Sequence, residues 1–193
     1  MRQLNSDRAA WVLAGGRSSR MGTDKARAES NGRALVLRVA DEAAAVCGSV
    51  SLVGDPLLYA ELGLPVIADR FPGQGPLAGM EAALAATQAD ANLIIACDMP
   101  AISQGVLVEL FSGDADCVVP RHDDGRLEPL CAVYRQRCHP VIQAALEAGI
   151  RKVTDALRLF AQHSRAIRYV RVSDPAAFAN LNTPDDWRRY HQG

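Results

Sequence analysis

Short apolar runs alternate along the chain with segments in which apolar residues recur at helical spacing. Short runs that end at Gly, Pro or Asp are typical of strands, whereas spacing of about 3.6 residues is typical of amphipathic helices. Strands are predicted at 9–14, 49–53, 64–68, 92–97, 116–120, 127–134 and 165–172. Helices are predicted at 34–47, 55–62, 76–88, 104–111, 139–148, 152–162 and 184–191.

This alternation predicts an α/β fold, a doubly wound and mostly parallel sheet with helices on both faces. The length of 193 residues fits one domain, 1–193, whose polar first residues, 1–8, we expect to be frayed. In such folds ligands bind outside the carboxyl ends of the strands. Residues that directly follow a strand are therefore the first candidates for a functional site.

A glycine-rich stretch, WVLAGGRSSRMGTDK at 11–25, follows the first strand and carries two arginines and a lysine. Gly15 and Gly16 allow a tight turn and a close approach of the backbone to a ligand. Backbone N–H groups in such a turn, together with Arg20 and Lys25, suit phosphate oxygens. We interpret the stretch as a cradle for a polyphosphate.

Two common phosphate loops do not match this stretch. A P-loop requires G-x-x-x-x-G-K-[ST], and a dinucleotide-binding loop requires G-x-G-x-x-G. Gly22 is followed by Thr23 and Asp24 before Lys25, and Gly15-Gly16-Arg17 lacks the second spacing. An ordinary turn with solvated cations is the alternative interpretation, and the spacing of Arg20 and Lys25 argues against it.

Asp98 directly follows the apolar strand predicted at 92–97, at the edge of the sheet that also holds the glycine-rich stretch. A carboxylate at that position suits Mg²⁺, which prefers oxygen ligands and shares them with substrate phosphates. Mn²⁺ is an alternative ion of the same charge. Before Met99-Pro100, Asp98 could instead form only a turn, but an acid at the end of a buried strand needs a partner.

The net charge of −1 gives no overall attraction to nucleic acid or to an anionic membrane, so any anion site must be local. No apolar run is long enough to span a bilayer. Five cysteines without C-x-x-C spacing favour a reducing compartment over a disulfide framework. We expect a cytoplasmic protein that binds neither nucleic acid nor membrane.

Four segments together resemble the nucleotidyltransferases related to molybdenum cofactor guanylyltransferase. They are L-A-G-G-x-S-x-R-M-G-x-D-K at 13–25, G-P-L-A-G at 75–79, C-D-x-P at 97–100 and N-x-N-T-P at 180–184. The segment 127–134 also resembles the strand that lies beside the second substrate in that family. The resemblance implies a Rossmann-like nucleotidyltransferase fold.

The resemblance also implies roles for individual residues. Catalysis is expected from Arg20, Lys25 and Asp98, with Asp98 as the metal ligand. Asp69 follows the strand predicted at 64–68, and we interpret the glycines of 75–79 as making room for a base or ribose. The expected GTP contacts are Leu13, Ala14, Gly15, Gly16, Lys25, Asp69, Gly75, Gly79 and Asp98. Asn180 and Asn182 are expected to contact the pterin, although Thr183 is also explained as a helix N-cap.

The implied reaction transfers GMP from GTP to the terminal phosphate of molybdopterin, or of its molybdenum-loaded form, and releases pyrophosphate. A substrate phosphate is already ionised, so catalysis rests on positioning and charge neutralisation. Transient contacts with proteins that deliver the cofactor or mature molybdoenzymes are implied too. Three alternatives stay open: cytidylyl transfer to the same pterin, nucleotidyl transfer to a sugar 1-phosphate, and a catalytically silent nucleotide-binding module.

Overall fold

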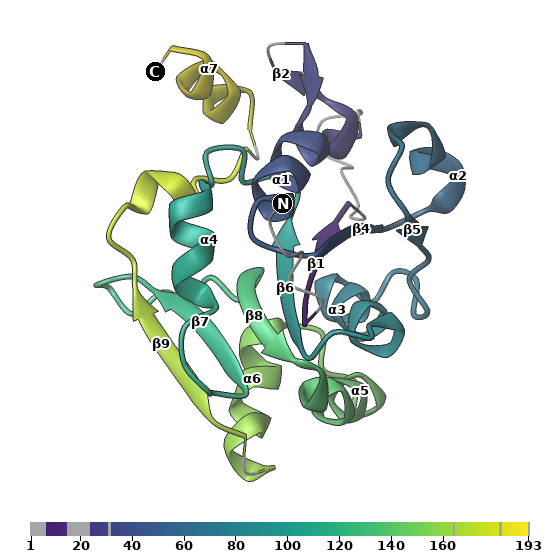
Figure 1. The fold of residues 1–193 in the computed structure, drawn as a ribbon, viewed down its shortest axis with the longest axis vertical. Helices are drawn as coiled ribbons and strands as arrows, with labels where there is room; N and C mark the ends of the chain where they lie inside the picture. Colours follow the sequence, from purple (N-terminus) through teal and green to yellow (C-terminus); the bar gives the residue numbers. More distant parts are fainter. Residues whose placement is uncertain (1–6, 15–23, 31, 164, 182, 193) are drawn as a thin grey trace.

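The computed structural model describes residues 7–14, 24–30, 32–163, 165–181 and 183–192. Within these residues, seven strands form one sheet in the order β5-β4-β1-β6-β8-β7-β9 (Figure 1). The strands of this sheet are β1 (Arg8–Leu13), β4 (Ser49–Val53), β5 (Val66–Ile67), β6 (Ala91–Ala96), β7 (Cys117–Arg121), β8 (Cys131–Arg135) and β9 (Ile167–Arg171). The predicted mostly parallel sheet is confirmed.

The sheet is built outward from β1. β1 pairs in parallel with β4 and with β6, and β4 pairs in parallel with β5. β8 runs antiparallel to both of its neighbours, β6 and β7, while β7 and β9 are parallel. The carboxyl ends of β1, β4, β5, β6, β7 and β9 therefore lie at one edge, together with the start of β8.

Helices cover both faces of the sheet. The long helices are α1 (Leu35–Ala44), α3 (Pro76–Ala86), α4 (Gln104–Leu110), α5 (His139–Glu147), α6 (Val153–Gln162) and α7 (Pro184–Gln192). Ala10 and Val12 of β1 face a core shared with α1 and α4. Trp11 and Leu13 point to the other face, where α3, α5 and α6 pack. This alternation along one strand separates the two cores, as expected for a central strand buried on both faces.

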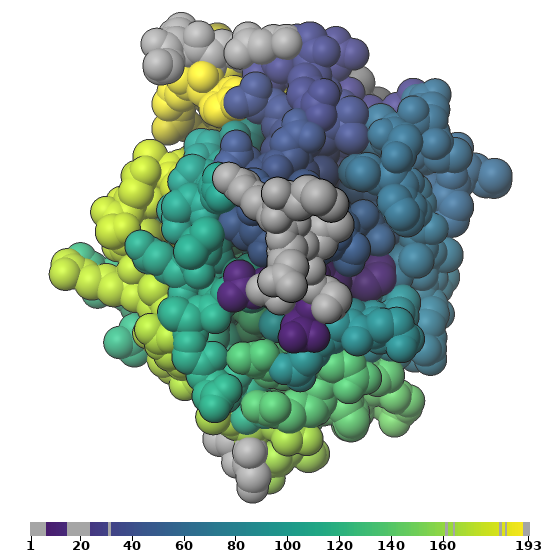
Figure 2. Space-filling model, viewed as in Figure 1, coloured from purple at the N-terminus to yellow at the C-terminus, as the bar shows by residue number. Residues whose placement is uncertain are grey.

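Short elements connect the layers. They are η1 (Lys25–Arg27), β2 (Glu29–Ser30), β3 (Arg33–Ala34), α2 (Pro56–Tyr59), η2 (Ala60–Leu62), η3 (Gln136–Cys138) and η4 (Pro175–Phe178). Figure 2 shows the blue segments around β4 and β5 on one side of the molecule and the yellow-green segments around β9 on the other. Among the described residues, no helix has the length and apolar character that crossing a membrane requires.

Most of the predicted elements are present, and three details differ. Arg8, assigned to a frayed terminus, is the first residue of β1 and pairs with Ala91. β8 begins at Cys131 rather than Leu127, because Pro129 has no N–H to donate and Glu128 closes a turn onto Cys131. The β2–β3 hairpin was not predicted, since two-residue strands leave no periodic pattern.

Candidate active site

Asp98 lies at the carboxyl edge of the sheet, two residues after β6 ends at Ala96. Its neighbour Cys97 donates its backbone N–H to the carbonyl of Leu13, at 3.3 Å, so the end of β6 is joined to the end of β1. The Asp98 side chain is half-buried. This is the edge at which the sequence predicted a ligand site.

Two charged side chains, Lys25 and Glu128, act on the carboxyl group of Asp98 with opposite effects. Burial raises the pKa of Asp98, the ammonium of Lys25 lowers it in opposition, and the carboxylate of Glu128 raises it further. Lys25 and Asp98, which are far apart in the sequence, are therefore brought together. Burial removes water from the carboxylate of Asp98, and Lys25 offsets only part of the cost. A further cation bound to this carboxylate would therefore be stabilised.

Lys25 is held by a short capped turn. Asp24 precedes η1 and its side chain accepts the backbone N–H of Ala26 at 3.0 Å. Ala26 is fully buried, which anchors the turn against the core. This arrangement fixes the backbone of Lys25 beside Asp98. Gly15, Gly16 and Arg20, which belong to the same predicted site, lie outside the described residues.

Leu13 and Ala14 use their backbone polar groups inside the protein. Ala14 donates its N–H to the carbonyl of Val53 at 2.9 Å. The hydroxyl of Tyr59 donates to the carbonyl of Ala14 at 2.8 Å. Both residues are buried. These bonds fix the backbone at the start of the glycine-rich stretch, and each carbonyl keeps a second lone pair that a ligand could use.

Tyr59 supports the start of the glycine-rich stretch, and the sequence did not reveal this role. Its ring lies against Gly54, where a Cβ atom would stand only 2.6 Å from Tyr59 Cε2. Burial raises the pKa of the Tyr59 phenol, and the neighbouring Asp24 raises it further, so the hydroxyl stays a donor. A tyrosine at the end of a four-residue helix carries no motif, so nothing in the sequence indicated its contacts with Gly54 and Ala14.

Asp69 follows β5 and forms a local turn. Its Oδ1 accepts the backbone N–H of Phe71 at 2.7 Å. In the sheet order β5 lies three strands from β6, a separation of roughly 14 Å at the usual strand spacing. Asp69 therefore lies at the same edge as Asp98 but would contact a different part of a bound ligand.

The two glycines of the 75–79 segment have different roles. Gly75 precedes α3 with φ +79°, a conformation that side chains rarely adopt. At Gly79 a Cβ atom would lie 3.2 Å from the Leu13 side chain, and Val53 is the next neighbour. The interpretation that Gly79 makes room for a base is corrected: the missing side chain lets α3 pack closely on β1 and β4.

The segment after η4 also reaches Asp98. Leu181 donates its backbone N–H to the Asp98 carbonyl at 2.9 Å. Asn180 precedes it, and its Oδ1 is buried without a hydrogen-bond partner among the described residues. Thr183 and Asp186 exchange side-chain to backbone bonds at 2.8 and 3.2 Å, which confirms the predicted N-cap of α7. Asn182 lies outside the described residues.

A buried pair beside this segment was also missed. His122 follows β7, Glu128 precedes β8, and their side chains are hydrogen-bonded at 2.8 Å. The signal was present in the sequence, because a glutamate inside the apolar run 127–134 needs a partner if the run is buried.

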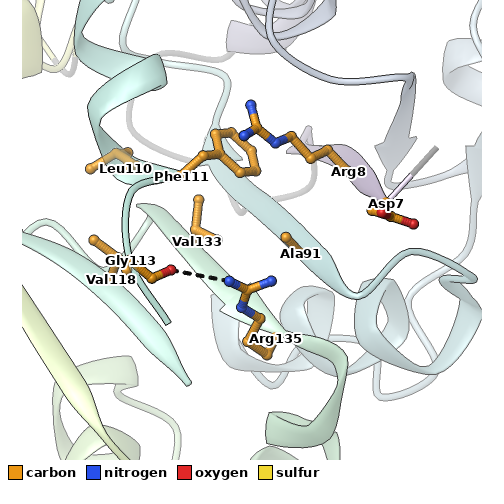
Figure 3. Close-up of a pocket in the computed structure, with 9 residues that line it drawn as sticks. All are labelled: Asp7, Arg8, Ala91, Leu110, Phe111, Gly113, Val118, Val133 and Arg135. Carbon is orange, nitrogen blue, oxygen red and sulfur yellow. Dashed lines mark hydrogen bonds between the residues drawn. The ribbon is translucent and has the colours of Figure 1, made fainter. Parts of the chain in front are cut away.

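A cavity of about 200 Å³ lies at the opposite edge of the sheet (Figure 3). Arg8 and Ala91, the first residues of β1 and β6, line it together with Phe111 and Arg135. The Arg8 guanidinium lies 4.4 Å from the centre of the Phe111 ring, and Arg135 donates to the Gly113 carbonyl at 3.2 Å. None of the described candidate site residues lines this cavity.

Comparison with known proteins identifies the family. The model of the MobA-like NTP transferase domain matches residues 10–166. The chain belongs to the MobA-like NTP transferase family. This member is therefore a nucleotidyltransferase, and its matched region includes Lys25, Asp69 and Asp98.

Individual relatives agree with this assignment. A protein of Pelotomaculum thermopropionicum named probable molybdenum cofactor guanylyltransferase is 38% identical, covering 91% of this chain and 87% of the relative. A molybdenum cofactor guanylyltransferase of Desulfosudis oleivorans is 35% identical, with coverages of 91% and 90%. Among solved structures, molybdopterin-guanine dinucleotide biosynthesis protein A of Archaeoglobus fulgidus has a TM-score of 0.79 at 27% identity, covering 95% and 97%. The doubly wound nucleotidyltransferase fold and a place in molybdenum cofactor biosynthesis follow.

Proposed function

We propose that this nucleotidyltransferase transfers GMP from GTP to the terminal phosphate of molybdopterin or its molybdenum-loaded form. An oxygen of the pterin phosphate attacks the α-phosphorus of GTP and forms a new P–O bond. The bond from the α-phosphorus to the α,β-bridging oxygen breaks, and its electron pair leaves with pyrophosphate. The product carries a pyrophosphate link between pterin and guanosine.

The observation that carries this proposal is the position of Asp98 at the carboxyl edge of the sheet, where the ammonium of Lys25, on its capped turn, lowers the pKa of the carboxyl group against the effect of burial. The transfer collects negative charge from a triphosphate and a second phosphate in one place. An ammonium group fixed at that place stabilises the charge that moves during the transfer. No general base is required, because the attacking phosphate is ionised at neutral pH.

Asp98 is also the residue that would hold Mg²⁺ or Mn²⁺. The described residues contain no group of three or more His, Cys, Asp or Glu side chains that could hold a metal ion. One carboxylate fits Mg²⁺ nevertheless, since this ion takes most of its ligands from substrate phosphates and water. When bound, the ion would neutralise charge on the triphosphate.

Guanine selectivity is supported by the names of the two relatives, both of which include guanylyltransferase. Each relative aligns with 91% of this chain. The carbonyls of Leu13 and Ala14 each accept a hydrogen bond within the protein and keep a second lone pair, so they can still contact a bound nucleotide. A site that hydrogen-bonds one base rejects another because buried polar groups are left unpaired. Cytidylyl transfer is the nearest competing activity.

Anaerobic transfer assays test the proposal directly. The protein is incubated with molybdopterin, Mg²⁺ and one α-labelled nucleotide at a time. Label from GTP should join the pterin with one pyrophosphate released per transfer. Equal labelling from CTP would replace the guanylyl assignment, and turnover only with sugar 1-phosphates would replace the acceptor. No pyrophosphate with any acceptor would mean a silent binding module.

Asp155→Asn is a matched control for these assays. Asp155 is partly exposed in α6, on the face of the sheet away from η1, and forms an ion pair across one helical turn with Arg158. Exposed pairs of this kind contribute little to stability. The variant should keep the activity of the unmodified protein.

A further inference from the structure

A cluster of a buried histidine–glutamate pair and one exposed arginine lies at the active-site edge, on the β8–β7 side of Asp98. His122 and Glu128 are 7% and 6% exposed. Nε2 of His122 lies 2.8 Å from Oε1 of Glu128, and the Arg126 guanidinium contacts the same carboxylate oxygen. A second Arg126 nitrogen lies 3.3 Å from His122 Nδ1.

One histidine tautomer satisfies all of these contacts. An arginine has only donors, so Nδ1 of His122 must accept from Arg126. Nε2 then carries the hydrogen and donates it to Glu128. The imidazole ring is fixed by hydrogen bonds at both of its nitrogens, and its orientation is set by the turn between β7 and β8.

The fixed ring supports the segment that follows η4. Phe178 packs against His122 in an edge-to-face arrangement, with ring centroids 5.8 Å apart and an interplanar angle of 76°. Phe178 is buried in the core that also contains Met99. Three residues later, Leu181 donates its N–H to the Asp98 carbonyl. The segment 178–181 is therefore held by His122 at one end and by Asp98 at the other.

Asn180 lies inside this held segment. Its Oδ1 is buried and has no hydrogen-bond partner among the described residues. A buried amide oxygen without a partner is costly unless a ligand or water completes it. The segment between Glu128 and β8 is joined to the end of β6 by the bond from Ala96 N–H to the Leu130 carbonyl, at 2.8 Å. The cluster, the segment and Asp98 are thus linked by direct contacts.

We infer that His122 is a positioning residue for the second substrate, acting through Phe178 on the placement of Asn180. Glu128 and Arg126 fix the ring that performs this task. This inference rests on the proposed function only in assigning Asn180 to the pterin. It predicts that the cluster controls affinity for the acceptor and leaves the nucleotide side unchanged.

Steady-state kinetics with His122 variants test the inference. His122→Ala removes both the ring and the hydrogen bond, and should raise the KM for molybdopterin by about tenfold or more, the loss of one hydrogen bond to a charged group. The KM for GTP should stay within about twofold. His122→Gln retains a donor for Glu128 but not the ring, and should give an intermediate KM. Circular dichroism and thermal unfolding on each variant establish that it is folded.

The control is Asp123→Asn in the same turn. Asp123 pairs with Arg171 on the surface, with side chains 70% and 79% exposed, and both KM values should be unchanged. An equal rise in both KM values of a folded His122→Gln, or no rise in either, would overturn the inference. If His122→Ala does not fold, the Gln variant alone decides. Unmodified protein that ignores molybdopterin but uses another acceptor contradicts the proposed function, and the same comparison is then made with that acceptor.

Discussion

At the scale of single residues, Asp98 combines two roles that can be separated by one substitution. Asp98→Asn keeps the size and the turn but removes the charge proposed to hold the metal ion. Transfer activity should fall by roughly two orders of magnitude or more, as when one strong electrostatic contact to a transition state is removed. Pyrophosphate release measured on the folded variant checks this, and near-normal turnover would contradict the proposed mechanism.

The same variant should not lose stability. Burial raises the pKa of Asp98 in the folded state, with Lys25 opposing and Glu128 adding to the effect. For an acid with a raised pKa, stability is fully present below the unfolded pKa of about 4 and is lost as the pH rises through the folded value. Asp98→Asn removes this loss. Its thermal midpoint relative to the unmodified protein should therefore improve between pH 4 and pH 7.

Sequence reasoning located residues whose chemistry is tied to strand ends and missed those defined by contact. Asp98 and Asp69 were placed correctly after their strands, because the end of an apolar run followed by Gly, Pro or Asp marks where a strand stops. Tyr59 could not be found, since nothing local signals that its hydroxyl meets Ala14 across the sheet. Gly79 was misinterpreted for the same reason: its neighbour Leu13 is distant in sequence.

At the scale of elements, the long helices and all strands of the main sheet were predicted, including the short β5, whereas the β2–β3 hairpin was not. α1, α5 and α6 were found because several helical turns repeat the apolar pattern, whereas α3, which is apolar around most of its circumference, was found from Pro76 at its first turn. The β2–β3 hairpin and the late start of β8 depend on two to four residues whose hydrogen bonds, rather than side chains, define them. The positions of the hairpin and of the β8 start are set by hydrogen bonds between chain segments, and the periodicity of a sequence does not show which segments pair.

Glu81 joins three elements and offers a test at this scale. It is completely buried in α3, lies 2.9 Å from His139 Nε2 of α5 and 3.5 Å from Arg70 beside Asp69. Glu81→Ala should lower the free energy of unfolding by about 2–3 kcal/mol through a cavity and a lost buried hydrogen bond. Glu81→Gln keeps an acceptor for His139 and should cost less than about 1 kcal/mol.

Denaturant unfolding of the two Glu81 variants makes this comparison. Glu61→Ala is the matched control, because Glu61 pairs with Arg27 on the surface and its side chain is 64% exposed. A Gln variant as unstable as the Ala variant would mean that the charge itself holds α3 to α5. That result would refute the assignment of a mainly hydrogen-bonded contact.

At the scale of the whole molecule, the proposed nucleotide side and the proposed acceptor side of the site lie on either side of β6. A ligand bound there should therefore raise the stability of the whole fold. A nucleotide at 100 times its dissociation constant stabilises the folded state by about 2.7 kcal/mol. For a protein of 193 residues this corresponds to a rise in thermal midpoint of roughly 5–10 °C. With Mg²⁺ present, GTP should produce this rise and CTP, ATP and UTP should produce less.

The metal dependence of that rise identifies its origin. Without Mg²⁺ the triphosphate would face the uncompensated Asp98 carboxylate, and the gain from GTP should shrink. Asp98→Asn should remove the difference between the two conditions, because its neutral side chain neither repels the triphosphate nor holds the ion. Thermal scans of both proteins, with GTP alone and with GTP and Mg²⁺, measure the four midpoints. An Mg²⁺ increment of the same size in both proteins would place the ion away from Asp98.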